Sequence, residues 1–143
     1  MRILLDEDVP IQVLDILRHI LKSHDVDHVQ IIHWKGKKDL FLLADAAARG
    51  YNLLVTNDRK QLSDPIECSA IKKSGMHHAR YEQAAGVRGL ALAVAAIIAA
   101  MPPLVEELEN QGGQRLVRIH SLRQRRRFDV TNPVTDPPRY WPR

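Results

Sequence analysis

Three aspartates in the first half of the chain stand where their carboxylates can meet. Asp6 follows the apolar run at residues 3–5, Asp58 comes just after the apolar run at 51–56, and Asp39 opens a segment with helical spacing. In a parallel sheet the carboxyl ends of the strands share one edge, and a helix that leads into the next strand begins near it. Like charges at close range are unfavourable unless a cation offsets them, and Mg²⁺ and Mn²⁺ prefer carboxylate oxygen. The spacing therefore predicts a Mg²⁺ or Mn²⁺ site made by Asp6, Asp39 and Asp58, which suits phosphoryl chemistry.

Each of these aspartates also has a structural explanation that the sequence leaves open. Aspartate at the end of a strand commonly shapes the turn that follows. Asp39 can simply cap the helix that it opens, because a carboxylate there interacts favourably with the helix dipole.

Apolar runs alternate along the chain with segments of helical periodicity. This order predicts a mainly parallel sheet flanked by helices on both faces. The expected strands are residues 3–5, 26–32, 51–56, 77–81 and 115–119. The expected helices are residues 10–22, 39–50, 61–73, 90–100 and 104–110, with Pro102 and Pro103 ending the fourth. We expect one α/β domain over residues 1–122, followed by an irregular, basic and Pro-rich tail over residues 123–143.

The composition is that of a single folded domain. The 143 residues are 45% hydrophobic and 27% charged. Acids at positions 6 to 8 interrupt the apolar start, so no signal peptide is expected. The longest apolar stretch, residues 89–101, is shorter than the about 20 residues of a membrane span. A single cysteine, Cys68, excludes an internal disulfide, and these features together predict a cytoplasmic protein without membrane contact.

Charge is distributed unevenly, although the formal net charge is only +4. Residues 1–70 carry nine Lys and Arg against eleven Asp and Glu, a net of −2, whereas residues 115–143 carry eight Arg against two Asp, a net of +6. The basic end includes a cluster at Arg123, Arg125, Arg126 and Arg127. Because arginine binds phosphate oxygens bidentately, this end predicts a polyanionic partner such as nucleic acid. An acidic partner protein and a merely solvated tail remain alternatives.

Other catalytic motifs are missing from the sequence. The seven histidines form no His-Glu-x-x-His pattern, and there is no Gly-x-Ser-x-Gly elbow or glycine-rich phosphate loop. We therefore expect the histidines to be surface or core polar groups. Trp34 and Trp141 are isolated, and either could stack on a base or lie in a partner interface.

Three segments, in this order, resemble small PIN-like domains. Residues 1–10, Met-Arg-Ile-Leu-Leu-Asp-Glu-Asp-Val-Pro, resemble the apolar strand, Asp-Glu-x-x-Pro and helix with which these domains open. Residues 38–50, Lys-Asp-Leu-Phe-Leu-Leu-Ala-Asp-Ala-Ala-Ala-Arg-Gly, resemble their Asp-opened second helix. Residues 51–59, Tyr-Asn-Leu-Leu-Val-Thr-Asn-Asp-Arg, resemble their strand ending in Thr-x-Asp. The likeness covers residues 1–62, and the rest of the chain is compatible in layout only.

The resemblance implies a single-domain, PIN-like three-layer sandwich and a metal-dependent endoribonuclease that hydrolyses RNA phosphodiester bonds. Many bacterial proteins of this kind, the VapC type, are toxins of type II toxin–antitoxin pairs that a small antitoxin protein neutralises. A homodimer is also compatible with the family. Carried over position by position, Asp6, Asp39 and Asp58 match the catalytic, metal-binding acids, and Glu7 matches the residue after the first acid.

Residues around the three acids are expected to support them. Thr56 can hydrogen-bond a ligand carboxylate, and neighbouring cations can contact phosphates of the RNA. The expected nucleic-acid contacts are Lys38, Arg59 and Lys60, together with Arg123, Arg125, Arg126 and Arg127.

One position departs from the family pattern. Lys60 stands where these domains often carry a further acid, and Asp64 or Glu67 could substitute for it. The alternative is therefore a catalytically inactive PIN-like module that binds nucleic acid or a partner protein. A receiver-like signalling domain also gathers acids at strand ends, but it needs a lysine after its fifth strand, where this chain has His120 and Ser121.

Overall fold

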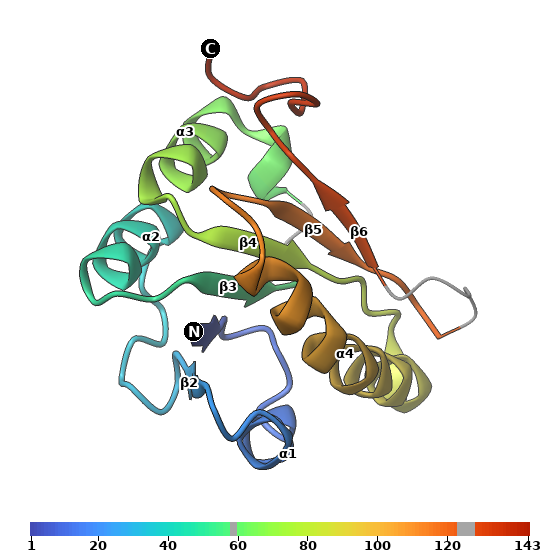
Figure 1. Cartoon of the computed structure of the whole chain (residues 1–143). Coiled ribbons are helices and arrows are strands. Elements are labelled where there is room, and N and C mark those ends of the chain that lie inside the picture. Colours follow the sequence, from blue (N-terminus) through green and yellow to red (C-terminus); the bar gives the residue numbers. More distant parts are fainter. Residues whose placement is uncertain (58–59, 123–127) are drawn as a thin grey trace.

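The computed structural model describes residues 1–57, 60–122 and 128–143. Within them the strands are β1 (Arg2–Leu5), β2 (Asp25–His28), β3 (Leu53–Thr56), β4 (His77–Arg80), β5 (Leu116–Ile119) and β6 (Phe128–Thr131). The helices are α1 (Val13–Ile20), α2 (Asp39–Ala48), α3 (Pro65–Ser74) and α4 (Gly86–Glu109), with a short 3-10 helix η1 (Gln61–Ser63) before α3 (Figure 1).

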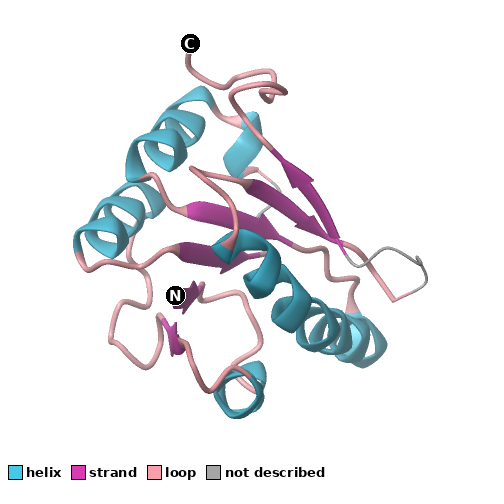
Figure 2. Cartoon of the chain, in the orientation of Figure 1, coloured by secondary structure: helices cyan, strands magenta, loops and turns pink. Residues whose placement is uncertain are grey.

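The strands form one mixed sheet in the order β2-β1-β3-β4-β5-β6. The first five are parallel, and β6 pairs antiparallel with β5 at one edge (Figure 2). From β1 the chain first moves outward to β2 and then returns past β1 to β3. The strand order therefore reverses between β1 and β3, and in doubly wound α/β proteins the ligand crevice opens at such a point, outside the carboxyl ends of the strands.

Alternate residues of the central strands pack on opposite faces of the sheet. Ile3 and Leu5 of β1 belong to a core shared with α1 and α4, whereas Leu4 belongs to a second core shared with α2 and α3. Leu54 lies in this second core, between Leu53 and Val55, which lie in the first. Because both faces are covered by helices, the chain is an α/β protein with helix, sheet and helix layers, as expected.

The prediction of an irregular tail is wrong for residues 128–131, which form β6. These residues pair with β5 from Ile119↔Phe128 to Leu116↔Thr131. Phe128 and Val130 pack against the core under α1 and α4, whereas Asp129 and Thr131 alternate with them. The period-two pattern of a half-buried strand was therefore present in the sequence, within a segment dominated by arginine and proline.

The prediction that Pro102 and Pro103 end a helix is also wrong. Both lie inside α4, which continues to Glu109. Two prolines remove the amide donors that would bond the carbonyls of Ile98 and Ala99, but these are half-buried and exposed residues, so water can satisfy them. The apolar stripe continues past the prolines, because Leu104, Val105 and Leu108 are buried. Packing against the sheet outweighs the local cost of proline.

By length and composition, α4 is the one helix among the described residues that could cross a membrane. In this fold it lies along the sheet (Figure 1), and its buried residues form the core with β1, β3 and β5. These buried residues are Gly89, Ala93, Ala96, Ile97, Ala100, Met101, Leu104, Val105 and Leu108. The helix therefore serves as a core helix here.

Candidate functional site

Asp6 lies at the carboxyl end of β1, where the strand order reverses. Its amide donates to the carbonyl of Val55 at 2.9 Å, which extends the pairing of β1 with β3 by one residue. Only 6% of Asp6 is exposed. Its Oδ1 accepts the amide of Glu7 at 2.8 Å, and its Oδ2 accepts the hydroxyl of the fully buried Thr56 at 2.9 Å. Each carboxylate oxygen therefore has a fixed direction and one remaining lone pair for a ligand.

Asp8 is a second acid at this edge, and it was not among the predicted site residues. Its Oδ1 accepts the amide of Asn57 at 3.1 Å, which ties the segment after β1 to the end of β3. Its carbonyl accepts the hydroxyl of Tyr81, just after β4, at 3.1 Å. The spacing Asp6-x-Asp8 after an apolar strand was the signal that could have identified it.

The acids at this edge act on one another electrostatically. Burial is the largest cause that raises the pKa of Asp6 to about 6, and the charge of Asp8 and then that of Asp39 raise it further. The hydrogen bonds from Glu7 and Thr56 lower it, but they do not offset the burial. Asp6 therefore titrates close to neutral pH, and a cation at its carboxylate would favour the charged form.

Asp39 is the first residue of α2 and is half-buried. Its place in the first turn also suits a carboxylate, because the helix dipole is positive there. The loop before it is held by Glu7, whose Oε2 accepts the amide of Gly36 at 2.9 Å. Glu7 therefore positions both acids. Its backbone amide hydrogen-bonds the Asp6 carboxylate, and its exposed side chain hydrogen-bonds the loop that leads to Asp39.

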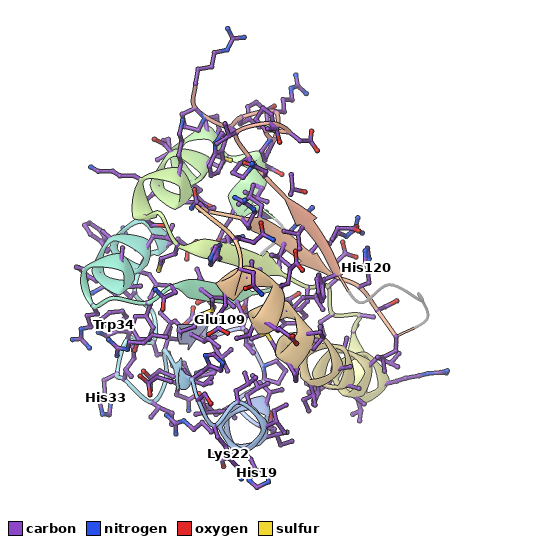
Figure 3. The ribbon with its side chains drawn as sticks, viewed as in Figure 1. His19, Lys22, His33, Trp34, Glu109 and His120 are labelled. Carbon is purple, nitrogen blue, oxygen red and sulfur yellow. The ribbon has the colours of Figure 1, made fainter. Side chains whose placement is uncertain are left out.

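Trp34, one of the two tryptophans that could stack on a base, is engaged within the protein. Trp34 lies between Arg49 at 4.4 Å and Lys37 at 4.9 Å from the ring centre, and Lys37 also forms an ion pair with Asp45. Figure 3 shows Trp34 beside α2. Its ring faces are occupied by cations, so Trp34 is not placed to stack on a base.

Lys38 and Lys60 are exposed, Lys38 just before α2 and Lys60 just before η1. The remaining predicted contacts, Arg59, Arg123, Arg125, Arg126 and Arg127, lie outside the described residues, as does Asp58.

The donor set suits a hard divalent cation in its chemistry. Asp6, Asp8 and Asp39 supply carboxylate oxygens, which Mg²⁺ and Mn²⁺ prefer, and their mutual repulsion is what a cation relieves. In the described part of the chain, no three His, Cys, Asp or Glu side chains lie close enough to hold a metal ion by themselves. A complete ligand set would therefore draw on Asp58 or on water.

The histidines have structural contacts. Buried His28 is bonded at both ring nitrogens, Nε2 to the carbonyl of Val9 at 2.8 Å and Nδ1 to the amide of Gln30 at 3.1 Å. His78 Nε2 lies 2.7 Å from Gln61 Oε1, which anchors η1 to β4. His120 follows β5 and lies 2.7 Å from Asp129 of β6, whereas His33 points outward (Figure 3). None of these four contacts the acids at the end of β1.

The site is thus a buried, proton-binding carboxylate at the reversal point of a doubly wound sheet, with two further acids beside it. Comparison with protein-family models, with curated proteins and with solved structures finds no match to this chain.

Proposed function

We propose that this protein is a Mg²⁺- or Mn²⁺-dependent endoribonuclease of the PIN-like type, the toxin of a type II toxin–antitoxin pair. One observation carries the proposal. Asp6 is buried at the β1/β3 reversal point, and this burial, together with the charges of Asp8 and Asp39, raises its pKa to about 6. A cluster of acids at a ligand-binding edge is costly to fold, and binding a divalent cation there offsets this cost.

Asp6, Asp39 and Asp58 would hold the cation, with Asp8 as a further oxygen donor beside Asp6. A bound Mg²⁺ or Mn²⁺ supplies charge stabilisation and an activated water for phosphodiester hydrolysis. The chain itself orients the acids. Thr56 and the amide of Glu7 fix the Asp6 carboxylate, so that Asp6 would orient the attacking water or accept its proton.

The RNA would approach along the edge that carries Lys38 and Lys60. Both side chains are exposed and flank the acids, one before α2 and one before η1. With Arg59, they would contact phosphates on either side of the bond that is cut. The basic cluster at Arg123, Arg125, Arg126 and Arg127 would extend this contact.

A small antitoxin protein would neutralise the enzyme by covering the same edge. Two large apolar side chains directly follow Asp39 in α2 and are exposed, Leu40 by 43% and Phe41 by 63%. Ile66 of α3 is exposed by 66%. A protein that covers Asp39 would bury these side chains, and protein partners favour such apolar patches. We place the pair in the cytoplasm, and a homodimer is compatible with this proposal.

The alternative is a PIN-like module without activity. It is favoured by Lys60, which stands where a further acid is expected, and by the lack of a three-ligand group among the described residues. Such a module would bind nucleic acid or a protein through the same edge.

The deciding experiment is cleavage of RNA by the purified protein with Mg²⁺, with Mn²⁺ and with chelator. Asp6→Asn keeps the size of the side chain but removes its charge and replaces one of its two acceptor oxygens by an NH2 donor. The matched control is Asp15→Asn, an exposed acid on α1. We expect cleavage that needs metal, is lost in Asp6→Asn and survives in Asp15→Asn. Folded, partner-free protein that cleaves no RNA with either metal would refute the enzyme and favour the inactive module.

A further inference from the structure

A row of polar residues crosses the sheet beside the acids. Thr56 of β3, Arg80 of β4, Arg118 of β5 and Asp129 of β6 are consecutive register partners. Thr56 in turn bonds Asp6. Residues in register on neighbouring strands point to the same face of a sheet. Two residues earlier on these strands, Leu54 and Leu116 lie in the core under α2 and α3, so the row belongs to that face.

The two arginines of this row lie in a hollow of about 270 Å³, which we call the arginine hollow. Leu62 and Ser63 of η1 line it, as do Thr131 of β6 and Pro138. Pockets that enclose a whole drug-sized ligand measure roughly 300–1,000 Å³. The arginine hollow therefore suits a small charged group rather than a complete nucleotide.

The positive charge in the arginine hollow is only partly balanced. Arg118 is 3.6 Å from Glu82, and both side chains are half exposed, so this ion pair is weak. Arg80 is half-buried, and its guanidinium group makes no ion pair or hydrogen bond with the described residues. Adjacent strands are about 4.8 Å apart, so the side chains of Arg80 and Arg118 leave the sheet side by side. Like charges placed directly opposite each other on neighbouring strands are destabilising. An anion between them removes that cost, and the guanidinium fork fits phosphate oxygens.

We propose that Arg80 and Arg118 form a subsite for a backbone phosphate of single-stranded RNA. This inference rests on the proposed function, because it assigns the substrate strand a path across the sheet from Asp6 to the arginine hollow. At a strand spacing of about 4.8 Å, the backbone of Arg80 lies roughly 10 Å from that of Asp6 and Arg118 roughly 14 Å. A stacked strand advances about 3.4 Å per nucleotide, so the subsite holds a phosphate three to four nucleotides from the bond that is cut.

Binding of a labelled single-stranded RNA, measured by fluorescence anisotropy in the Asp6→Asn background, tests the subsite without cleavage. Arg80→Gln should raise Kd roughly tenfold, because the phosphate loses a charged hydrogen-bonding partner. It should also reduce the slope of log K against log salt concentration by about 0.7, the value for one phosphate contact to a single strand. The matched control Arg88→Gln removes the same charge from an exposed position on α4 and should change Kd less than twofold. Arg80→Lys keeps the charge but loses the bidentate guanidinium group. Its Kd should therefore lie between those of the parent and of Arg80→Gln.

A dinucleotide is too short to reach from Asp6 to the arginine hollow. Its affinity should therefore be the same in Arg80→Gln and in the parent, whereas that of the longer RNA differs. Equal binding of the longer RNA by Arg80→Gln and Arg88→Gln, with both variants folded by circular dichroism, overturns the subsite. Arg80-dependent binding of inorganic phosphate without any effect on RNA also overturns it, because the arginine hollow would then take free phosphate.

Failure of this inference can be separated from failure of the proposed function. If the native protein cleaves RNA and Arg80→Gln changes neither binding nor KM, the subsite is wrong and the nuclease stands. If the native protein cleaves nothing but Arg80→Gln still weakens RNA binding, the nuclease is wrong and the subsite stands. If both hold, Arg80→Gln should raise KM for the longer RNA and leave kcat unchanged.

Discussion

Folding buries the carboxylate of Asp6 and makes it harder to ionise. Its pKa rises from 3.8 to about 6, so the folded state binds the proton more tightly than the unfolded chain. Stability from this group is therefore highest below pH 4, falls as the pH rises toward 6, and stays lower above it. The ionised form costs roughly 3 kcal/mol, at about 1.4 kcal/mol for each pKa unit.

Asp6→Asn should therefore raise the melting temperature at pH 7.5 by several degrees, because it removes the buried charge. At pH 4 the difference should shrink, since the folded state then holds Asp6 protonated and no longer buries its charge. Thermal denaturation at the two pH values, followed by circular dichroism, measures this. Mn²⁺ should raise the melting temperature of the native protein at pH 7.5 but not that of Asp6→Asn. A lower melting temperature for Asp6→Asn at both pH values would contradict this account of the site.

Thr56→Val tests the hydrogen bond from Thr56 to Asp6, because it removes the hydroxyl with little change in side-chain volume. The hydroxyl of Thr56 bonds Asp6 Oδ2 and lowers its pKa, so its loss should raise that pKa further. Metal-dependent cleavage requires ionised Asp6, so its rate in the native protein should fall at a pH below about 6, because the bound cation favours the charged carboxylate. In Thr56→Val this fall should occur at a higher pH, as a pH profile of kcat/KM would show.

The control for that profile is Thr135→Val, which removes an exposed hydroxyl bonded only to the turn carbonyl of Asn132. Its pH profile should match that of the native protein. If Thr56→Val lowers the rate equally at every pH, Thr56 acts on folding or geometry and not on the charge of Asp6.

At Gly89, the backbone of α4 lies in close contact with the backbone of Ala84. A Cβ built on Gly89 would lie 1.9 Å from the carbonyl oxygen of Ala84, in the segment that joins β4 to α4. Alanine normally favours a helix over glycine by about 1 kcal/mol, but here the methyl group cannot fit unless that segment moves. Gly89→Ala should therefore destabilise the protein, by about 1–3 kcal/mol as in other overpacked cores.

Gly112→Ala is the matched control, because nothing lies within 4 Å of a Cβ at that position. Urea denaturation of the two variants should show a lower midpoint for Gly89→Ala and an almost unchanged one for Gly112→Ala. Equal stability of both variants would mean that residues 82–85 adapt freely to α4.

At the scale of the whole molecule, the residues of the basic cluster lie outside the described part of the chain, but the strands before and after them in the sequence are described. The cluster falls in the chain between β5 and β6, and the described residues on either side, Leu122 and Phe128, follow β5 and begin β6. Since β5 is parallel to β1 and β3, its carboxyl end lies at the same edge as Asp6. The chain before the basic cluster therefore ends β5 at the edge that carries the acids.

Replacing Arg123, Arg125, Arg126 and Arg127 by Gln should weaken RNA binding uniformly across sequences. It should also flatten the dependence of log K on log salt by about 3, the value for four phosphate contacts to a single strand. Binding titrations at several salt concentrations measure both effects. Unchanged RNA binding with weaker binding of a partner protein would assign the cluster to that partner, and no change in either would leave it a solvated segment.

The sequence by itself determined the local elements whose patterns are complete within a few residues. Runs such as Ile3–Leu5 predict buried strands because every residue is apolar, and Leu42, Leu43 and Ala46 predict one buried face of α2. The alternation of these elements predicts the parallel sheet and therefore the common edge of Asp6 and Asp39. Asp58 and the arginine cluster lie outside the described residues, so their predicted roles stay predictions.

Only the tertiary structure decided the features that depend on distant partners. Residues 128–131 form β6 because they can hydrogen-bond to the edge of β5. α4 continues past Pro102 and Pro103 because the residues that follow them are buried against the sheet. The bond of Asp8 to Asn57 and the alignment of Arg80 with Arg118 join residues that are 49 and 38 positions apart. No local pattern encodes such pairs, because a strand register fixes them and the register is set by the whole sheet.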